Sequence, residues 1–198
     1  MLKIDMALKL TEKFGTKKLA MSAIGVAFMF VVTSFLQIPM FGIGAGYIHL
    51  GDTVLFIVAF ICGPLVGGIT GGFGGFFADL FLGYPSYALF TLVIKAVQGA
   101  IVGGLAKSIF CKSLRYQVFK FLGILILSGT FMIVGYFLVN IMLFDWSIVI
   151  VSLVGDVIQI LTNIIFASLA FPSICRYYNA IRRENLNLQI DDELNSQQ

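Results

Sequence analysis

The chain has 198 residues, of which 59% are hydrophobic and only 12% are charged. Soluble domains average about half apolar and about a quarter charged residues, so this composition excludes a soluble globular enzyme, a disordered chain and a nucleic-acid-binding domain. The net charge is +3, and the three cysteines form neither a CxxC pair nor a metal-binding spacing. The sequence therefore predicts an all-α integral membrane protein.

Apolar stretches divide the chain into six predicted transmembrane helices, since a helix that crosses the hydrocarbon layer needs about 20 mostly apolar residues. The long apolar stretch 53–82 is divided at Gly63-Pro64, because a helix is expected to stop before a proline. The segment Gly83-Tyr84-Pro85-Ser86 is a turn signal. The predicted spans are residues 19–37, 53–62, 65–82, 87–110, 119–143 and 147–171.

The segments outside the spans are short or polar. Residues 1–18 form either a short interfacial helix or a frayed terminus. Residues 38–52 make a polar, glycine-rich loop between the first two helices. We expect one six-helix membrane domain over residues 1–178, followed by a polar cytoplasmic tail over residues 179–198.

Lysine and arginine fall on one side of this predicted topology. Five lysines precede the first span, four cations surround the loop between the fourth and fifth spans, and three arginines follow the sixth. The opposite segments 38–52, 83–86 and 144–146 contain neither residue type. Because cytoplasmic loops carry the excess of Lys and Arg, both termini are predicted to be cytoplasmic. Twelve of the thirteen cations are explained in this way, and only Lys95 lies inside a span.

Small residues recur at helical spacing in two of the spans. Gly67, Gly71 and Gly75 form a GxxxG column in the third span, which allows a neighbouring backbone to approach closely. We expect this column to pack inside the protein. A stripe of Ala20, Ala23 and Ala27 in the first span is either internal packing or a docking face for another protein.

Polar residues inside the spans fall on single helix faces, although an ionised side chain at mid-bilayer costs about 2.5 to 3.5 kcal/mol on insertion scales. The fourth and sixth spans each carry such a face, and Lys95 and Asp156 on these faces lie at similar depth. The pattern predicts a polar cavity that opens outward. Its expected ligand-binding residues are His49, Asp52, Asp79, Tyr84, Tyr87, Thr91, Lys95, Gln98, Asp156, Gln159 and Asn163. In a simpler interpretation, Lys95 and Asp156 only neutralise each other between helices, which does not exclude a ligand nearby.

Motifs for catalysis are missing from the sequence. The segment 103–108, GGLAKS, resembles a phosphate-binding loop, but Ile101 and Ala106 occupy the positions of its two required glycines. There is no HExxH, GxSxG or Cys–His arrangement, and the chain has one histidine. We therefore expect no enzymatic activity, no cofactor and no metal site.

Four motifs carry a resemblance to a known family. Gly51-Asp52 opens the second helix, Gly63-Pro64 interrupts the apolar stretch, a glycine-rich helix ends in Ala-Asp-Leu, and Phe-Thr-Leu-Val-Ile-Lys ends at Lys95. Over residues 48–105 this pattern resembles the substrate-binding S component of energy-coupling factor (ECF) transporters. It is most similar to the riboflavin-type branch, which also holds hydroxymethylpyrimidine- and pyridoxine-type members.

The resemblance implies a multi-pass protein of a prokaryotic cell membrane that binds a water-soluble vitamin or its precursor from outside. Residues 38–52 would be an ordered loop that covers the ligand. The partners would be a membrane coupling protein, the T component, and two cytoplasmic ATPases, so that ATP hydrolysis takes place on separate chains. The family's docking face for the coupling protein is an AxxxA motif, which Ala23 and Ala27 match, with Ala20 on the same stripe.

The ligand expected from the residues is a small polar heterocycle. Carboxylates suit a ligand with N–H donors, Lys95 suits an acceptor, and Tyr47, Tyr84, Tyr87 and Trp146 could stack on a flat ring. Riboflavin, a pyrimidine and a pyridine all fit this description. Two other functions stay open: a structural or assembly subunit of a membrane complex, and a membrane-embedded enzyme that uses Asp156 and Lys95 as an acid–base pair.

Overall fold

The computed structural model describes residues 15–39, 47–106, 109 and 114–196. Residues 1–14, most of the predicted loop between the first two helices (40–46) and Cys111 lie outside the described residues, so the alternatives for the N-terminus stay predictions. The two cysteines in the described part, Cys62 and Cys175, are free.

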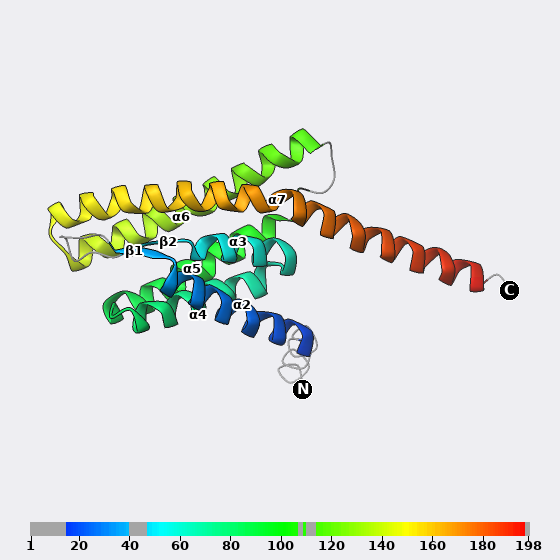
Figure 1. Ribbon diagram of the computed structural model, residues 1–198, viewed down its shortest axis with the longest axis horizontal. Coiled ribbons are helices and arrows are strands. Elements are labelled where there is room, and N and C mark those ends of the chain that lie inside the picture. The colour runs from blue at the N-terminus through cyan, green and yellow to red at the C-terminus, as the bar shows by residue number, and fades with distance from the viewer. Residues whose placement is uncertain (1–14, 40–46, 107–108, 110–113, 197–198) are drawn as a thin grey trace, which may run out of the picture.

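The described part contains six helices and one pair of short strands (Figure 1). The number of helices agrees with the sequence prediction. The strands, β1 and β2, pair antiparallel with Gln37 opposite His49, and the sequence did not predict them. The elements are α2 (Thr16–Phe35), β1 (Gln37–Pro39), β2 (Tyr47–His49), α3 (Gly51–Cys62), α4 (Pro64–Phe81), α5 (Pro85–Ala106), α6 (Leu114–Leu143) and α7 (Trp146–Ser196).

Glycine and proline set the helix boundaries in the first half of the chain. Gly63 has φ 87° and Gly83 has φ 85°, a left-handed conformation that glycine adopts without a steric cost. Pro64 then begins α4 and Pro85 begins α5, at positions where the missing N–H of proline costs no helical hydrogen bond. The predicted break and turn are therefore present.

Helix α7 is longer than the predicted sixth span. It runs for 51 residues through Pro172 to Ser196 and projects beyond the other helices (Figure 1). The span was predicted to end near residue 171 because hydropathy falls there, but the end of an apolar stretch does not require the end of a helix. The assignment of residues 179–198 to a cytoplasmic tail stays a prediction.

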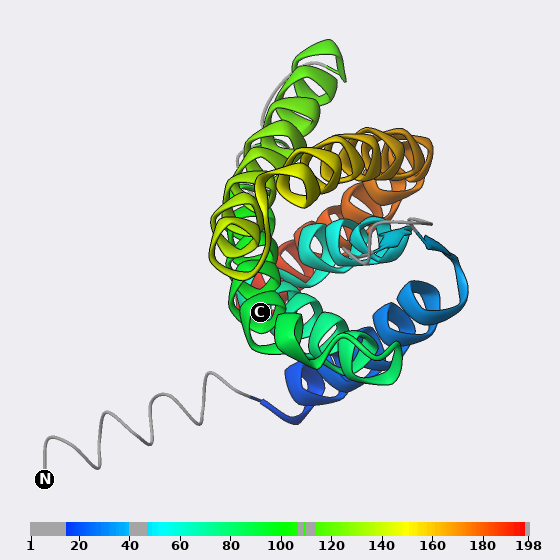
Figure 2. The same ribbon diagram turned by 90° about the vertical axis from the view of Figure 1, so that its left-hand side faces the viewer.

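The short helix α3 lies at the centre of the bundle. It contacts α2, α4, α5 and α7, and most of its residues are buried. Figure 2 looks along the helices and shows α6 and α7 on one side of α3, with α2, α4 and α5 on the other. Helix α3 begins two residues after β2 and ends at the Gly63-Pro64 break.

Glycine brings α4 and α5 into close contact. A Cβ atom added at Gly68 would lie 3.1 Å from the carbonyl oxygen of Ala96, and one at Gly72 would lie 2.9 Å from that of Leu92. A Cβ at Gly67 would lie 2.5 Å from Ala59 Cβ. The glycine columns therefore pack inside the protein, as the sequence predicted.

Length and composition agree with a membrane protein. Four helical segments are long and apolar enough to cross a bilayer: Thr16–Phe35, Pro85–Ala106, Tyr116–Leu143 and Trp146–Arg176. Helix α3 is a shorter apolar helix, and α4 has 18 residues. The turn after α4, the turn after α6 and both strands lie at one end of the bundle, and the start of α2 and the start of α6 lie at the other (Figure 1).

Candidate functional site

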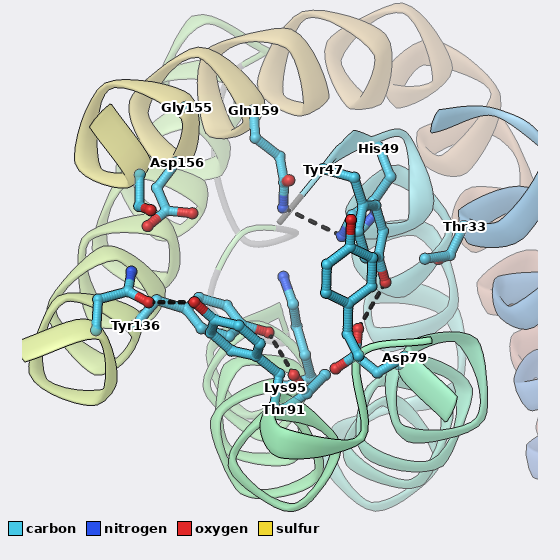
Figure 3. A pocket seen from close by; sticks show the side chains of 15 residues that line it. Thr33, Tyr47, His49, Asp79, Thr91, Lys95, Tyr136, Gly155, Asp156 and Gln159 are labelled. Carbon is cyan, nitrogen blue, oxygen red and sulfur yellow. Dashed lines mark hydrogen bonds between the residues drawn. The ribbon is translucent and has the colours of Figure 1, made fainter. Parts of the chain in front are cut away.

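A pocket lies at the end of the bundle that carries the two strands (Figure 3). It encloses about 60 Å³ of free space. Every element except α3 and β1 contributes to its wall. The lining residues are Thr33, Tyr47, His49, Gly75, Asp79, Tyr84, Tyr87, Thr91, Lys95, Tyr136, Asn140, Ser152, Gly155, Asp156 and Gln159.

The structure brings most of the predicted ligand-binding residues to this pocket. Those that line it are His49, Asp79, Tyr84, Tyr87, Thr91, Lys95, Asp156 and Gln159. Asp52, Gln98 and Asn163 are buried but do not line it. Whether any of them contacts a ligand stays a prediction, and the geometry separates the residues that face the pocket from those behind its wall.

The buried cation Lys95 pairs with Asp52 rather than with Asp156. Lys95 Nζ lies 2.6 Å from Asp52 Oδ1 and 2.8 Å from Oδ2, and it is 2.9 Å from Met132 Sδ. Both charged side chains are at most 1% exposed. The simpler interpretation, in which Lys95 and Asp156 neutralise each other, therefore named the wrong partner. Depth along the fourth and sixth spans did not identify the partner, because the partner lies on another helix: Asp52 is in the first turn of α3.

His49 is held as a neutral imidazole beside this ion pair. It is 8% exposed, and burial lowers its pKa to about 4, with a smaller lowering by Lys95 and an opposing effect of Asp52. The backbone N–H of Gly51 donates to His49 Nδ1 at 3.0 Å. Because Nδ1 is thus an acceptor, the proton of the neutral ring is on Nε2.

The Nε2–H group of His49 has no acceptor in the amide opposite it. Gln159 Nε2 lies 3.3 Å away and donates to Asp52 Oδ2 at 3.3 Å, so both nitrogens of the contact carry hydrogen. Turning the amide over would place its oxygen against the Asp52 carboxylate. The His49 Nε2–H is therefore a donor at the pocket wall.

Asn163 connects three elements behind the pocket. Its Oδ1 accepts from the backbone N–H and the hydroxyl of Thr53, each at 2.8 Å, and its Nδ2 donates to the carbonyl oxygen of His49 at 2.8 Å. These bonds fix the start of α3 and the end of β2 against α7. Gln98 lies deeper, is fully buried, and its side-chain nitrogen and oxygen have no hydrogen-bond partner among the described residues.

Tyrosines make up much of the pocket wall, and three of them donate their phenolic protons within the protein. Tyr47 donates to Asp79 Oδ1 at 2.6 Å, Tyr87 to Asn140 Oδ1 at 2.5 Å, and Tyr136 to Thr91 Oγ1 at 3.0 Å (Figure 3). The rings of Tyr47 and Tyr84 lie 5.3 Å apart. Burial raises the pKa of the Tyr47 hydroxyl far above its usual value, so it keeps its proton.

Trp146 does not belong to this aromatic wall. It is 67% exposed at the start of α7 and does not line the pocket. The prediction that it could stack on a ligand rested on its place near the outer rim. In the structure its side chain points outward, because the first turn of α7 lies at the edge of the bundle.

The sequence prediction missed the contribution of α6 to the pocket. Tyr136 and Asn140 both line it and lie four residues apart, on one face of the helix. A tyrosine and an asparagine at this spacing in an apolar span are the same signal that identified the polar faces of the fourth and sixth spans. Thr33 of α2 also lines the pocket, and an isolated threonine gives no comparable signal.

The alanine stripe lies on the outer surface of α2. Ala20, Ala23 and Ala27 are exposed, and Ala23 and Ala27 lie in an apolar groove between α2 and α4. The groove is also lined by Val26, Phe30, Phe77, Leu80 and Phe81. The exposed position agrees with a docking face, and which of the two roles the stripe has stays a prediction.

The chain is similar to one family of known sequence and to two individual proteins. The profile described as "ECF-type riboflavin transporter, S component" matches residues 13–174. A protein of Lactococcus lactis subsp. cremoris, the thiamine precursor transporter HmpT, is 30% identical over 169 residues, which are 85% of this chain and 94% of that protein. An uncharacterized protein of Pyrococcus woesei is 38% identical over 135 residues, which are 68% of this chain and 86% of that protein.

Proposed function

Since this chain belongs to the family of ECF-type riboflavin transporter S components, we propose that it binds a single-ring vitamin precursor in the pocket of Figure 3 and takes part in its uptake. The family is one of transporter components rather than enzymes. The observation that carries the proposal is a pocket with aromatic walls and buried polar groups at one end of a membrane helix bundle. Ligand sites generally combine such apolar walls with a few placed polar groups.

The size of the pocket favours one ring over three. Its free volume of about 60 Å³ suits a pyrimidine or pyridine better than the three fused rings and polyol chain of riboflavin. The relative from Lactococcus lactis is described as a transporter of a thiamine precursor, which agrees with a pyrimidine. Hydroxymethylpyrimidine is therefore our first candidate, pyridoxine the second and riboflavin the third.

The ligand would enter from outside the cell. The pocket lies at the end of the bundle with the strands and the turns after α4 and α6 (Figure 1), whose predicted external segments contain no Lys or Arg. By the positive-inside rule, this end would face outward, and six spans would put both termini in the cytoplasm. The hydrogen bond from Tyr47 to Asp79 would hold β2 beside the ligand.

The polar residues divide into two proposed roles. Residues at the pocket wall would contact the ligand: His49, Asp79, Tyr84, Tyr87, Thr91, Asp156 and Gln159. Asp52 and Asn163 would support them from behind, as the ion pair of Asp52 with Lys95 and the hydrogen bonds of Asn163 to Thr53 and His49 indicate. The side chain of Gln98 has no partner among the described residues, and its role as a ligand contact stays a prediction. Lys95 lines the pocket but would act chiefly by holding Asp52.

Energy for uptake would come from partner chains. We propose a membrane coupling protein and two cytoplasmic ATPases, with the stripe of Ala20, Ala23 and Ala27 as the docking face for the coupling protein. The exposed position of the stripe in an apolar groove supports this role, because small side chains permit close helix packing in membranes.

Binding by the purified protein tests the proposed function. The protein is extracted in detergent, examined for a co-purified vitamin by mass spectrometry and titrated calorimetrically with hydroxymethylpyrimidine, pyridoxine and riboflavin. We expect submicromolar binding of a single-ring compound. Failure to bind any vitamin, pyrimidine or pyridine at this concentration would contradict the proposal.

A further inference from the structure

The ammonium group and three of the four phenol groups that line the pocket already donate to other side chains of the protein. Lys95 directs its ammonium at both oxygens of Asp52 and at Met132 Sδ, and an ammonium has three N–H groups. Tyr47, Tyr87 and Tyr136 each donate to another side chain. A ligand that presents only acceptors would therefore find few of these groups free.

Two carboxylates at the pocket wall have a buried oxygen without a partner among the described residues: Asp79, whose other oxygen accepts from Tyr47, and Asp156. Asp156 Oδ2 is buried and has no hydrogen-bond partner among the described residues. Lys95, the buried cation of the site, forms its ion pair with Asp52 instead. Leaving a buried polar group without a partner is costly, so Asp156 is a position where a donor from outside the protein would be stabilising.

The neighbouring wall offers a complementary donor. His49 Nε2–H has no acceptor in Gln159, since Gln159 Nε2 is engaged with Asp52. His49 and Asp156 lie on different sides of the pocket in Figure 3. The pocket therefore presents an acceptor on one side and a donor on the other.

We infer that Asp156 selects ligands whose ring carries an amino group, with a ring nitrogen directed at His49. The inference rests on the proposed function and names the substrate class within it. An aminopyrimidine has this pattern, because its amino group donates to the carboxylate while a ring nitrogen on the far side accepts from the imidazole. A flavin offers an imide N–H and hydroxyl groups, and pyridoxine offers hydroxyl groups, so neither combines a ring amino group for Asp156 with a ring nitrogen opposite it for His49.

The test compares two probes that differ in one group. The first is 4-amino-5-hydroxymethyl-2-methylpyrimidine, and the second is the same ring with hydrogen in place of the amino group. Leaving a buried acceptor without a donor costs about 5- to 100-fold in affinity, so wild-type protein should bind the amino probe more tightly by this factor. In Asp156→Leu, which removes both acceptors, the two probes should bind within about threefold of each other.

Two variants complete the measurement. Asp156→Asn retains one amide oxygen, so it should show a preference between those of wild type and Asp156→Leu. Asp145→Asn removes a carboxylate from an exposed position just before α7 and should retain the full preference. If Asp156→Leu fails to fold, equal affinities of wild type for the two probes would still overturn the inference, and Asp156→Asn tests whether the preference depends on Asp156.

The outcomes separate the inference from the proposed function. Equal affinity of wild type for both probes, or an unchanged preference in folded Asp156→Leu, would overturn the inference and leave the proposed function standing. Binding of pyridoxine or riboflavin but of neither probe would also overturn only the inference. If wild-type protein binds neither probe and no vitamin, both are overturned.

Discussion

A buried histidine gives the pocket a defined protonation state over the physiological pH range. His49 lies in β2, outside the membrane-spanning helices, and burial lowers its pKa to about 4. The neutral ring accepts from Gly51 through Nδ1 and carries its proton on Nε2 at the pocket wall. Protonation would put hydrogen on Nδ1 and break the bond to Gly51.

The free energy of unfolding should therefore decrease as the pH is lowered, because the unfolded state takes up a proton that the folded state does not. Unfolded His49 is protonated below its ordinary pKa of about 6.5, whereas the folded ring stays neutral down to about 4. The stabilisation is complete above pH 6.5 and decreases as the pH falls toward 4, by about 2 kcal/mol at pH 5. The difference between the unfolding temperatures in detergent at pH 7 and pH 5 measures this loss of stability. His49→Gln should lose less stability over this interval, and an equal loss would contradict the assignment.

The Lys95–Asp52 pair should be more important for stability than for direct contact with the ligand. In Lys95→Met the Asp52 carboxylate stays buried without its partner, which should cost about 3–5 kcal/mol. The double variant Asp52→Leu/Lys95→Met removes both charges and should recover most of the unfolding temperature.

Asp156→Asn is the matched control for this ion pair, because Asp156 does not pair with Lys95 in the structure. It should leave the unfolding temperature nearly unchanged. A large loss of unfolding temperature in Asp156→Asn would contradict the pairing of Lys95 with Asp52. A double variant as unstable as Lys95→Met would contradict it too.

Residue types and spacing predicted most of the residues that line the pocket, but not which carboxylate pairs with Lys95. Tyr87, Thr91 and Lys95 on α5, with Asp156 and Gln159 on α7, line it as their helical faces indicated. The identity of the Lys95 partner depends on how deep α3 begins and how it is rotated, which the spacing of one helix does not determine.

The close contact between helices α4 and α5 depends on glycines, which have no side chain, at the interface. A Cβ atom at Gly99 would overlap the carbonyl group of Gly67, so Gly99→Ala should force the two helices apart. We expect a loss of about 1–3 kcal/mol, the usual cost of overpacking, as a lower unfolding temperature and a lower yield.

Gly104→Ala provides the control on the same helix. A Cβ at Gly104 would meet no atom within 4 Å, so this variant should be at least as stable as wild type, since alanine is the better helix former. Equal effects of the two substitutions would contradict the close contact between α4 and α5.

Helix boundaries were more predictable than the strands. Gly63-Pro64 and Gly83 changed the backbone direction where expected, because their conformational preferences are local. The strands β1 and β2 have three residues each, too few for a period to be visible, and they depend on the packing of His49 against α7 through Asn163.

For the whole molecule, docking to a coupling protein and binding of the ligand should be separable. Ala23 and Ala27 lie in the groove between α2 and α4 and do not line the ligand pocket. Leucine at both positions should abolish uptake by cells that express the partner chains while leaving the affinity of the purified protein unchanged. Loss of ligand binding would show that the stripe stabilises the fold instead, and normal uptake would place the docking face elsewhere.

The most direct measurement for the molecule as a whole is a ligand titration after the pocket has been filled. Ser152 lines the pocket and is 5% exposed, whereas Ile150, two residues earlier on α7, points outward and is 59% exposed. Calorimetry with hydroxymethylpyrimidine should give submicromolar binding to wild type and Ile150→Phe, and at least 100-fold weaker binding to folded Ser152→Phe. Equal affinities of the two variants, or no binding to wild type, would contradict a vitamin site in this pocket.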